Sequence, residues 1–379
     1  MSHLPPRVLT LLLCLTAFPG LATWGREGPV VRQEAPFPTI IGLPATDTAE
    51  PVRYEVLRGD FHMHTPHSDG VLSPAQRVIE AWQYGYDVIA ITDHGDFRAY
   101  EEALSTAKAF GVLLIRGMET GLSGKEHLVA LDFSADYQPR NPHQWAETEG
   151  QSQVFYQDEW RSLAAAGGYV IYAHPHVGLG EPMLWGIGQG LLQGIEVKND
   201  VVGAEWNTVQ SHGTYWYPFA LDWAVEHNLT IFADSDVHGA RDETEQAVTL
   251  VLVEDRSPEG VMEALRAGRT LAYFNGMLCA HQWVLELLMA SLVDLDLTEV
   301  NDGKIFLRLE NRGPVKLVAQ ITGMPVEPIT LGSYQKVVVG LRRKPEAVTV
   351  VWKNLYIRST ENLTTTHALT EMSKDQPSR

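Results

Sequence analysis

The segment from Asp60 to Gly70 reads Asp-Phe-His-Met-His-Thr-Pro-His-Ser-Asp-Gly, and it decides how the rest of the chain is interpreted. His62 and His64 are two residues apart, so both imidazoles project from the same face of an extended strand. Asp69 lies in a turn-prone Ser-Asp-Gly and can bring a carboxylate oxygen back toward the imidazoles. Nitrogen and oxygen donors together favour Zn, Mn or Fe over Ca or Mg. The segment therefore predicts a metal site at the end of a strand.

Strand-like and helix-like segments alternate after this site. Ser73-Pro-Ala-Gln76 is a capping box with proline at the first helical position, and it predicts a helix to about Tyr84. Further strands are predicted over residues 87–92, 112–115, 127–133, 169–173, 194–197, 230–233 and 247–253. Further helices are predicted over residues 97–110, before Gly167, and over 219–227, 258–265 and 279–293. This alternation predicts a parallel α/β arrangement.

Nine side chains of metal-ligand type fall at or just beyond the ends of these predicted strands. They are His62, His64, Asp69, His94, Glu119, His127, His174, Asp236 and His238. Active sites of α/β barrels lie at the carboxyl ends of the strands, so this placement favours a barrel over an open sheet. We therefore expect the nine residues to converge on one rim as metal ligands.

The motifs around these residues resemble those of the PHP (polymerase and histidinol phosphatase) family. They read His62-Met-His64-Thr with Ser68-Asp69-Gly70, Thr92-Asp93-His94, Gly117-Met-Glu119, Tyr172-Ala-His174-Pro175 and Ser235-Asp236-Val-His238. The resemblance covers roughly residues 56 to 275. It implies a distorted (β/α)7 PHP barrel that holds two or three divalent metal ions, for which we expect Mn, Zn or Fe.

The resemblance also divides the nine ligands among the ions. The first ion would lie among His62, His64, Glu119 and Asp236, the second among Glu119, His127 and His174, and a third position, or the completion of the first, would use Asp69, His94 and His238. The chain departs from the family pattern at two places. Asp234 stands where glycine is common, and the connection from Glu119 to His127 is short.

Other polar residues near the predicted strand ends are candidates for catalysis and substrate binding. The candidate catalytic residues are His176 as a general acid, Asp93 as a carboxylate that orients a ligand, and Arg241 as a cation for a phosphate oxygen. The candidate substrate-binding residues are Lys198, Asn199 and Arg116. Structural alternatives stay open: a turn cap for His176, a strand-end polar pair for Lys198 and Asn199, and a salt bridge to Glu243 or Glu245 for Arg241.

The rest of the chain divides by composition. Residues 1–23 combine Arg7, an apolar run and a small-residue end, which is typical of a signal peptide and predicts a secreted or periplasmic protein; an uncleaved anchor is the alternative. Residues 24–52 are predicted as an extended linker or arm outside the core, and residues 53–296 as the metallohydrolase barrel. Residues 297–358 alternate in polarity and predict a small C-terminal antiparallel β domain, followed by a polar tail over 359–379.

Charge and cysteine content restrict the partners. The chain has 47 acidic and 29 basic residues and a net charge of -18, which disfavours long nucleic acids and, after signal removal, membrane surfaces. Of its two cysteines, Cys14 lies in the predicted signal, so Cys279 has no partner for an internal disulfide.

The resemblance implies a metal-dependent phosphoester hydrolase acting on small phosphomonoesters or phosphodiesters. Two divalent ions a few ångströms apart can supply hydroxide near neutral pH and neutralise a phosphoryl oxygen. The chain also resembles exported carbaryl-hydrolase-like proteins of this family at Gly268-Arg-Thr270 and Asn275-Gly276, which makes hydrolysis of a carbamate or carboxyl ester the alternative. A third hypothesis is a non-catalytic metal- or glycan-binding module, and the intact ligand set argues against it.

Overall fold

The computed structural model describes residues 31–33, 36–42, 50–122, 126–138, 156–202, 209–211, 214–241, 247–299, 304–324 and 327–368. The predicted signal peptide lies outside these residues. Within them, every helix is too short or too polar to cross a membrane.

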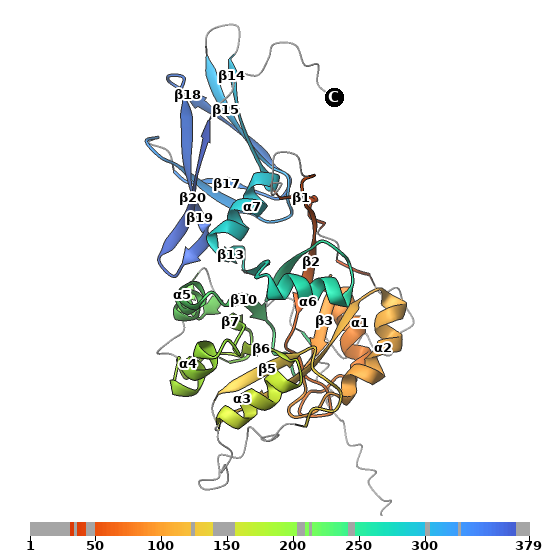
Figure 1. Ribbon diagram of the computed structural model, residues 1–379. Helices are drawn as coiled ribbons and strands as arrows, with labels where there is room; N and C mark the ends of the chain where they lie inside the picture. Colours follow the sequence, from red (N-terminus) through yellow and green to blue (C-terminus); the bar gives the residue numbers. More distant parts are fainter. Residues whose placement is uncertain are drawn as a thin grey trace, which may run out of the picture.

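A strongly curved sheet forms the lower body of the molecule (Figure 1). Its strands, in their order across the sheet, are β10 (Thr230–Asp234), β7 (Gly194–Asn199), β6 (Tyr169–Tyr172), β5 (His127–Leu131), β4 (Leu113–Gly121), β3 (Val88–Ile91), β2 (Arg53–Asp60) and β11 (Val248–Val253). β3, β6 and β11 read as short, mostly apolar runs and are buried along their whole length, as expected for strands covered on both faces.

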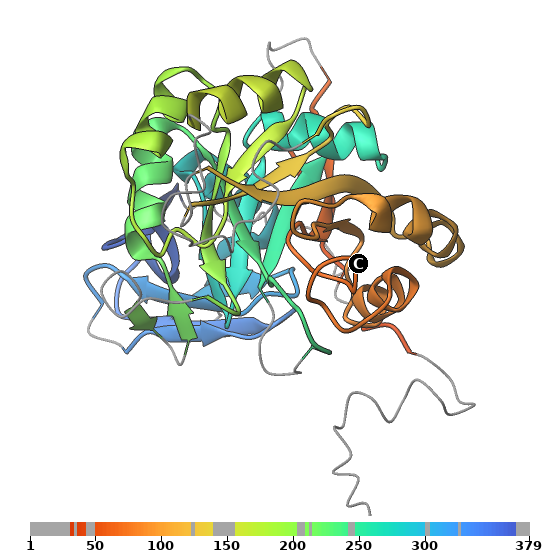
Figure 2. The same cartoon turned by 90° about the horizontal axis from the view of Figure 1, so that it is seen from below.

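Helices surround this sheet on its outside, as the view from below shows (Figure 2). They are α1 (Pro74–Gln83), α2 (Arg98–Phe110), α3 (Tyr156–Ala165), α4 (Glu181–Gly188), α5 (Pro218–His227) and α6 (Pro258–Arg266). The predicted capping box is present at the start of α1, where Ser73 and Gln76 bond to each other's backbone N–H groups. Gly111 ends α2 with a φ of 67°, a conformation that glycine adopts without steric cost.

The curved sheet returns on itself through threonine side chains that join β10 to β11 and β12 (Thr270–Phe274). Thr249 Oγ1 accepts from Ala233 N at 2.9 Å and lies 3.0 Å from Ala233 O. Thr270 Oγ1 donates to Ile231 O at 2.8 Å. Side-chain bonds thus replace a backbone ladder along this seam. The α/β fold class is confirmed.

The strand directions differ from the parallel arrangement that we predicted. β5 is antiparallel to both β4 and β6, and β11 is antiparallel to β2. The connection from β4 to β5 is too short for a crossover helix, and strands joined in that way pair antiparallel. Because of this reversal, His127 begins β5 opposite Gly121, near the end of β4. The short connection from Glu119 to His127 therefore places both residues at the same rim.

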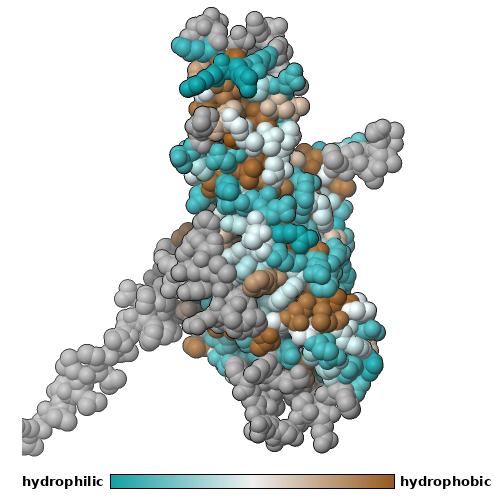
Figure 3. Space-filling model, turned by 90° about the vertical axis from the view of Figure 1, so that its left-hand side faces the viewer, coloured by the Kyte–Doolittle hydropathy of each residue, from teal (hydrophilic) through white to brown (hydrophobic). Residues whose placement is uncertain are grey.

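The barrel sheet continues into the C-terminal β region. β13 (Met277–Cys279) pairs in parallel with β19 (Ala347–Arg358), and β19 pairs with β16 (Leu317–Ile321) and β20 (Glu361–Ala368). The other elements are α7 (Gln282–Leu292), β14 (Val293–Glu299), β15 (Ile305–Asn311), β17 (Ile329–Leu331), β18 (Lys336–Leu341) and the hairpin β8 (Val209–Ser211) and β9 (Thr214–Trp216). β14, β15 and β18 form a separate antiparallel sheet. In the space-filling view the β region continues directly into the barrel (Figure 3).

Two segments that we predicted to lie outside the core contribute to it. Ile40 in β1 (Ile40–Ile41) is fully buried, and β1 pairs with β2. Leu363 in β20 is also fully buried, so residues 361–368 are a strand and not part of a polar tail. Residues 369–379 lie outside the described part of the chain.

Candidate metal centre

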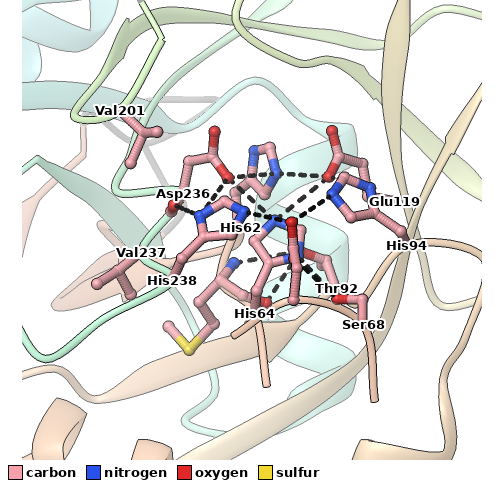
Figure 4. A network of polar contacts seen from close by, with 12 residues as sticks. His62, His64, Ser68, Thr92, His94, Glu119, Val201, Asp236, Val237 and His238 are labelled. Carbon is pink, nitrogen blue, oxygen red and sulfur yellow. Dashed lines mark hydrogen bonds and ion pairs between the residues drawn. The ribbon is translucent and has the colours of Figure 1, made fainter. Parts of the chain in front are cut away.

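Three strand ends bring four buried side chains of metal-ligand type to one point (Figure 4). His62 and His64 follow β2, Glu119 lies in β4, and Asp236 follows β10. Asp236 N donates to His62 O at 2.8 Å, and His64 N donates to Val237 O at 3.0 Å. The extension of β2 and the segment after β10 therefore run side by side, with their side chains facing a common centre.

The distances among these four residues fit a single metal ion. The Nε2 atoms of His62 and His64 lie 3.2 and 3.3 Å from Glu119 Oε2. The same two atoms lie 3.3 and 3.0 Å from Asp236 Oδ1. Donors placed about 2.0–2.1 Å from a tetrahedral ion are roughly 3.3–3.4 Å from one another. Within the described part of the chain, His62 Nε2 and Glu119 Oε2 are buried without a hydrogen-bond partner, which is costly unless a cation serves both.

Glu119 also belongs to a second cluster. Its Oε1 atom lies 2.8 Å from His127 Nδ1 and 3.2 Å from His174 Nε2. The first cluster (His62, His64, Glu119 and Asp236) and this second cluster (Glu119, His127 and His174) together are the inner clusters. Because Glu119 contributes one oxygen to each, its carboxylate is placed to bridge two ions.

The third group, called the outer cluster below, consists of His64, Asp69, His94 and His238. Asp69 Oδ2 lies 3.6 Å from His94 Nε2 and 3.3 Å from His238 Nε2. Asp69 Oδ1 lies 3.6 Å from His64 Nδ1. The Asp69 side chain is 39% exposed and that of His238 is 29% exposed, against 1% for Glu119. The three groups contain all nine residues that we predicted as ligands. The first two groups have the members that the family resemblance implied, and the outer cluster adds His64 to the implied set of Asp69, His94 and His238.

The pKa values show how strongly the inner carboxylates attract positive charge. Burial lowers the pKa of His64, but the neighbouring carboxylates of Asp236 and Glu119 outweigh it and raise the pKa to about 9. Burial likewise lowers the pKa of His62, and Asp236 and Glu119 raise it well above its usual range. Burial raises the pKa of Glu119, whereas His62 and His127 hold it well below its usual range. A divalent cation, which replaces protons on such ligands, suits this environment.

Two of the ligands have a backbone conformation that non-glycine residues rarely adopt. The φ angle is 25° at His174 and 55° at Asp236. Such strain concentrates at functional sites, where the surrounding structure holds the residue in place.

A family model for the PHP domain matches residues 60–163, the stretch that carries the first six of the nine ligands. The chain contains a PHP domain.

Relatives of the PHP domain include two enzymes that are much longer than the matched regions. A 5'-3' exoribonuclease of Haemophilus influenzae is 42% identical over 77 residues, which are 20% of this chain and 28% of the relative. A PolC-type DNA polymerase III of Bacillus subtilis is 31% identical over 161 residues, covering 38% of this chain and 11% of the relative. This chain thus spans less than a third of either enzyme.

A solved structure shares the fold over nearly the whole chain. It is a two-domain protein from Bacteroides vulgatus that contains a predicted PHP-like metal-dependent phosphoesterase. The TM-score is 0.73 at 23% sequence identity, over 90% of this chain and 100% of that chain. The combination of a PHP domain with a C-terminal β region is therefore found in another protein.

Asp93 supports the loop of the PHP domain that carries Asp69. Its Oδ1 accepts from Thr65 N at 2.7 Å and from Ser68 Oγ at 2.8 Å, and its Oδ2 accepts from Thr65 Oγ1 at 2.6 Å. These bonds occupy both oxygens of a fully buried carboxylate. Asp93 is therefore a positioning residue for the 65–70 loop, whereas we had predicted that it orients a ligand directly.

The Arg241 side chain is buried in the protein and does not line the exposed part of the centre. Its guanidinium contacts the buried carboxylate of Asp60 and donates to Tyr86 Oη at 3.2 Å. The side chain is 1% exposed, so it is not placed to hold a phosphate oxygen. The alternative partners, Glu243 and Glu245, lie outside the described residues.

The three predicted substrate-binding residues also contact other parts of the protein. Lys198 Nζ lies 2.7 Å from Asp200 Oδ1. Asn199 Oδ1 accepts from the backbone of Val201 at 2.9 Å. Arg116 donates to the Phe133 carbonyl at 3.1 Å. These contacts favour the strand-end polar pair for Lys198 and Asn199, and they give Arg116 a contact within the protein.

His176 is half-buried beside the second cluster. Its Nδ1 lies 2.7 Å from the carbonyl oxygen of His174, so Nδ1–H donates this bond. With the proton fixed on Nδ1, Nε2 can donate a proton only when the ring is cationic. This geometry is compatible with the predicted general acid, which stays a prediction.

Glu196, which we did not predict as a site residue, orients one histidine from each inner cluster. Its Oε1 lies 2.7 Å from His62 Nδ1, and its Oε2 accepts from His174 N at 2.6 Å. Metal-bound histidines commonly donate their second nitrogen to such a carboxylate. The available signal was an acidic residue inside the apolar strand Gly194–Val197, since a fully buried carboxylate there requires partners.

We expect Glu196→Gln to lower the affinity for metal about 10- to 100-fold, the usual effect of removing such a partner. The amide keeps the size of the side chain but offers one acceptor oxygen in place of two. Competition titration against a chelator measures the change, with Glu259→Gln on the exposed face of α6 as the matched control. Equal affinities in both variants and the wild type would contradict the role given to Glu196.

Proposed function

We propose that the protein is an exported, metal-dependent hydrolase of small phosphomonoesters or phosphodiesters. The observation that carries the proposal is the sharing of Glu119 and His64 between adjacent ligand clusters. Two or three divalent ions of Mn, Zn or Fe in such clusters would activate water and neutralise charge on a phosphoryl group. The residues present fit these ions in donor type, spacing and burial.

The chain's own residues account for the remaining requirements of hydrolysis. The Glu119 carboxylate fixes the separation of the inner clusters, and Glu196 sets the orientation of His62. His176, beside the second cluster, supplies a proton to the leaving group when its ring is cationic. Asp69 and His238 are exposed members of the outer cluster, so a substrate can approach the centre from their side.

The proposals that the substrate is small and that the protein is exported rest on the sequence. The two relatives are named for reactions on nucleic acid, but each matches only part of this chain. With 47 acidic and 29 basic residues, this protein attracts a polyanion weakly. Export is proposed from residues 1–23, whose pattern is typical of a signal peptide.

Hydrolysis of a carbamate or carboxyl ester is the second candidate, and the positions of the basic side chains favour it. Arg241, Lys198 and Arg116 were the residues predicted to contact a phosphate or its ester group, and all three are engaged elsewhere. A neutral ester needs no basic side chain to bind it. Its hydrolysis would use the same metal-activated water.

A screen of metal-loaded protein against three p-nitrophenyl compounds tests the proposal. The compounds are p-nitrophenyl phosphate, bis(p-nitrophenyl) phosphate and p-nitrophenyl acetate, each with Mn and with Zn. We expect turnover of at least one phosphoester, abolished by a chelator and by Asp236→Ala. Turnover of the acetate alone would select the second candidate, and no turnover of any compound with either metal would contradict both.

A further inference from the structure

Arg77, on α1, ties together the two segments that carry most of the outer cluster. Its Nε and Nη2 atoms donate to His64 O at 3.2 and 3.0 Å. Nη2 also donates to His238 O at 3.1 Å, and Nη1 donates to Gly239 O at 2.9 Å. The segment after β2 and the segment after β10 are therefore held by one planar guanidinium group, whose geometry a lysine cannot reproduce.

The orientation of this guanidinium is fixed by a buried ion pair. Nη1 of Arg77 donates to Glu80 Oε2 at 2.6 Å, and Glu80 Oε1 accepts from Arg241 N at 2.8 Å. Arg77 is fully buried and Glu80 is 4% exposed. A buried arginine with such a complete set of partners keeps one geometry, because any other would leave a charge unpaired.

The backbone around the outer cluster leaves little freedom for any other arrangement. Val71 N donates to His238 O at 2.8 Å, so the same carbonyl that Arg77 contacts also joins the two segments directly. A Cβ at Gly70 would overlap the carbonyl of His64, so the turn that carries Asp69 packs tightly against this point. The positions of Asp69 and His238 thus depend on the arrangement that Arg77 holds.

The inner clusters have supports of their own. Glu196 orients His62 and the backbone of His174, and the ladder between β4 and β5 places Glu119 and His127 together. None of these contacts passes through Arg77. Loss of Arg77 should therefore affect the outer cluster selectively, although His64 belongs to both groups.

We propose that Arg77 is a positioning residue for the outer metal position. This inference rests on the proposed function, since it requires that the clusters bind metal. Arg77 acts on the outer cluster through the carbonyl groups of His64, His238 and Gly239. Replacing Arg77 should therefore lower the affinity for the outer ion and leave the affinities for the inner ions as in the wild type.

The test compares Arg77→Lys with Asp69→Asn, which changes an exposed outer ligand directly. Titration of the metal-free full chain with Mn or Zn against a chelator gives the affinity of each ion. We expect Arg77→Lys to weaken the weakest-bound ion about 10- to 100-fold and to leave the tighter ions unchanged. The double variant should bind no more weakly than Asp69→Asn alone, because both changes act on one position. Arg98→Lys, on the surface of α2, is the matched control.

Three outcomes overturn the proposal. In the first, Arg77→Lys binds every ion with wild-type affinity. In the second, it lowers the affinity for all ions equally. In the third, its effect on affinity adds to that of Asp69→Asn. If Arg77→Lys does not fold, Glu80→Gln replaces it, because this change weakens the anchor of Arg77 while leaving the guanidinium in place. A selective loss of the outer ion is again expected, and its absence overturns the proposal. A wild-type protein that binds no metal would instead contradict the proposed function.

Discussion

Replacing Glu119 with glutamine is expected to remove metal from both inner clusters and to abolish turnover. One carboxylate oxygen faces His62 and His64, and the other faces His127 and His174. An amide presents a donor to one of these two sets and cannot neutralise a cation. Because Glu119 is placed to be a direct ligand of two ions, we expect a loss of turnover beyond the roughly 100-fold typical of a partner outside the ligand set.

Elemental analysis and steady-state kinetics on the same preparation measure this effect. Glu286→Gln, on the exposed face of α7, is the control for changing a glutamate anywhere in the protein. A Glu119→Gln protein that keeps its full metal content would show that the inner clusters do not depend on a bridging carboxylate.

The second large effect is expected at His176. Its replacement by alanine should leave metal content unchanged but lower turnover about 10²- to 10⁴-fold, the range for a general acid. The loss should be smaller for p-nitrophenyl phosphate than for an alkyl phosphate, because p-nitrophenolate departs without protonation.

Metal analysis and a comparison of the two substrates separate the possible roles of His176. Equal losses on both substrates would exclude proton donation. The turn-cap alternative, supported by the bond between His176 and the His174 carbonyl, would then be the better account. Loss of metal would show that His176 acts on its neighbour His174.

The convergence of the nine candidate ligands was predictable because their signals are local. His62 and His64 alternate along a strand, and Asp236 and His238 follow an apolar strand within one short motif. Residues at neighbouring strand ends meet once the sheet curves, so sequence order was enough to bring them to one rim. The direction of β5 was not needed for this, although it explains why His127 reaches Glu119.

The residues that support the ligands were harder to predict because their partners are distant in sequence. Glu196 meets His62 across 134 positions, and Arg77 meets His238 across 161. The sequence of α1 does not reveal the role of Arg77. That role depends on which strand ends α1 packs against. Arg241 was wrongly predicted to contact substrate for the same reason. Its partner is the buried carboxylate of Asp60, and the sequence does not show that Asp60 is buried and needs a cation.

Anomalous diffraction from crystals grown with Mn or Zn tests the central claim most directly. The account predicts one anomalous peak among His62, His64, Glu119 and Asp236, and a second among Glu119, His127 and His174. Crystals saturated with either metal that show no peak at these two positions would contradict it.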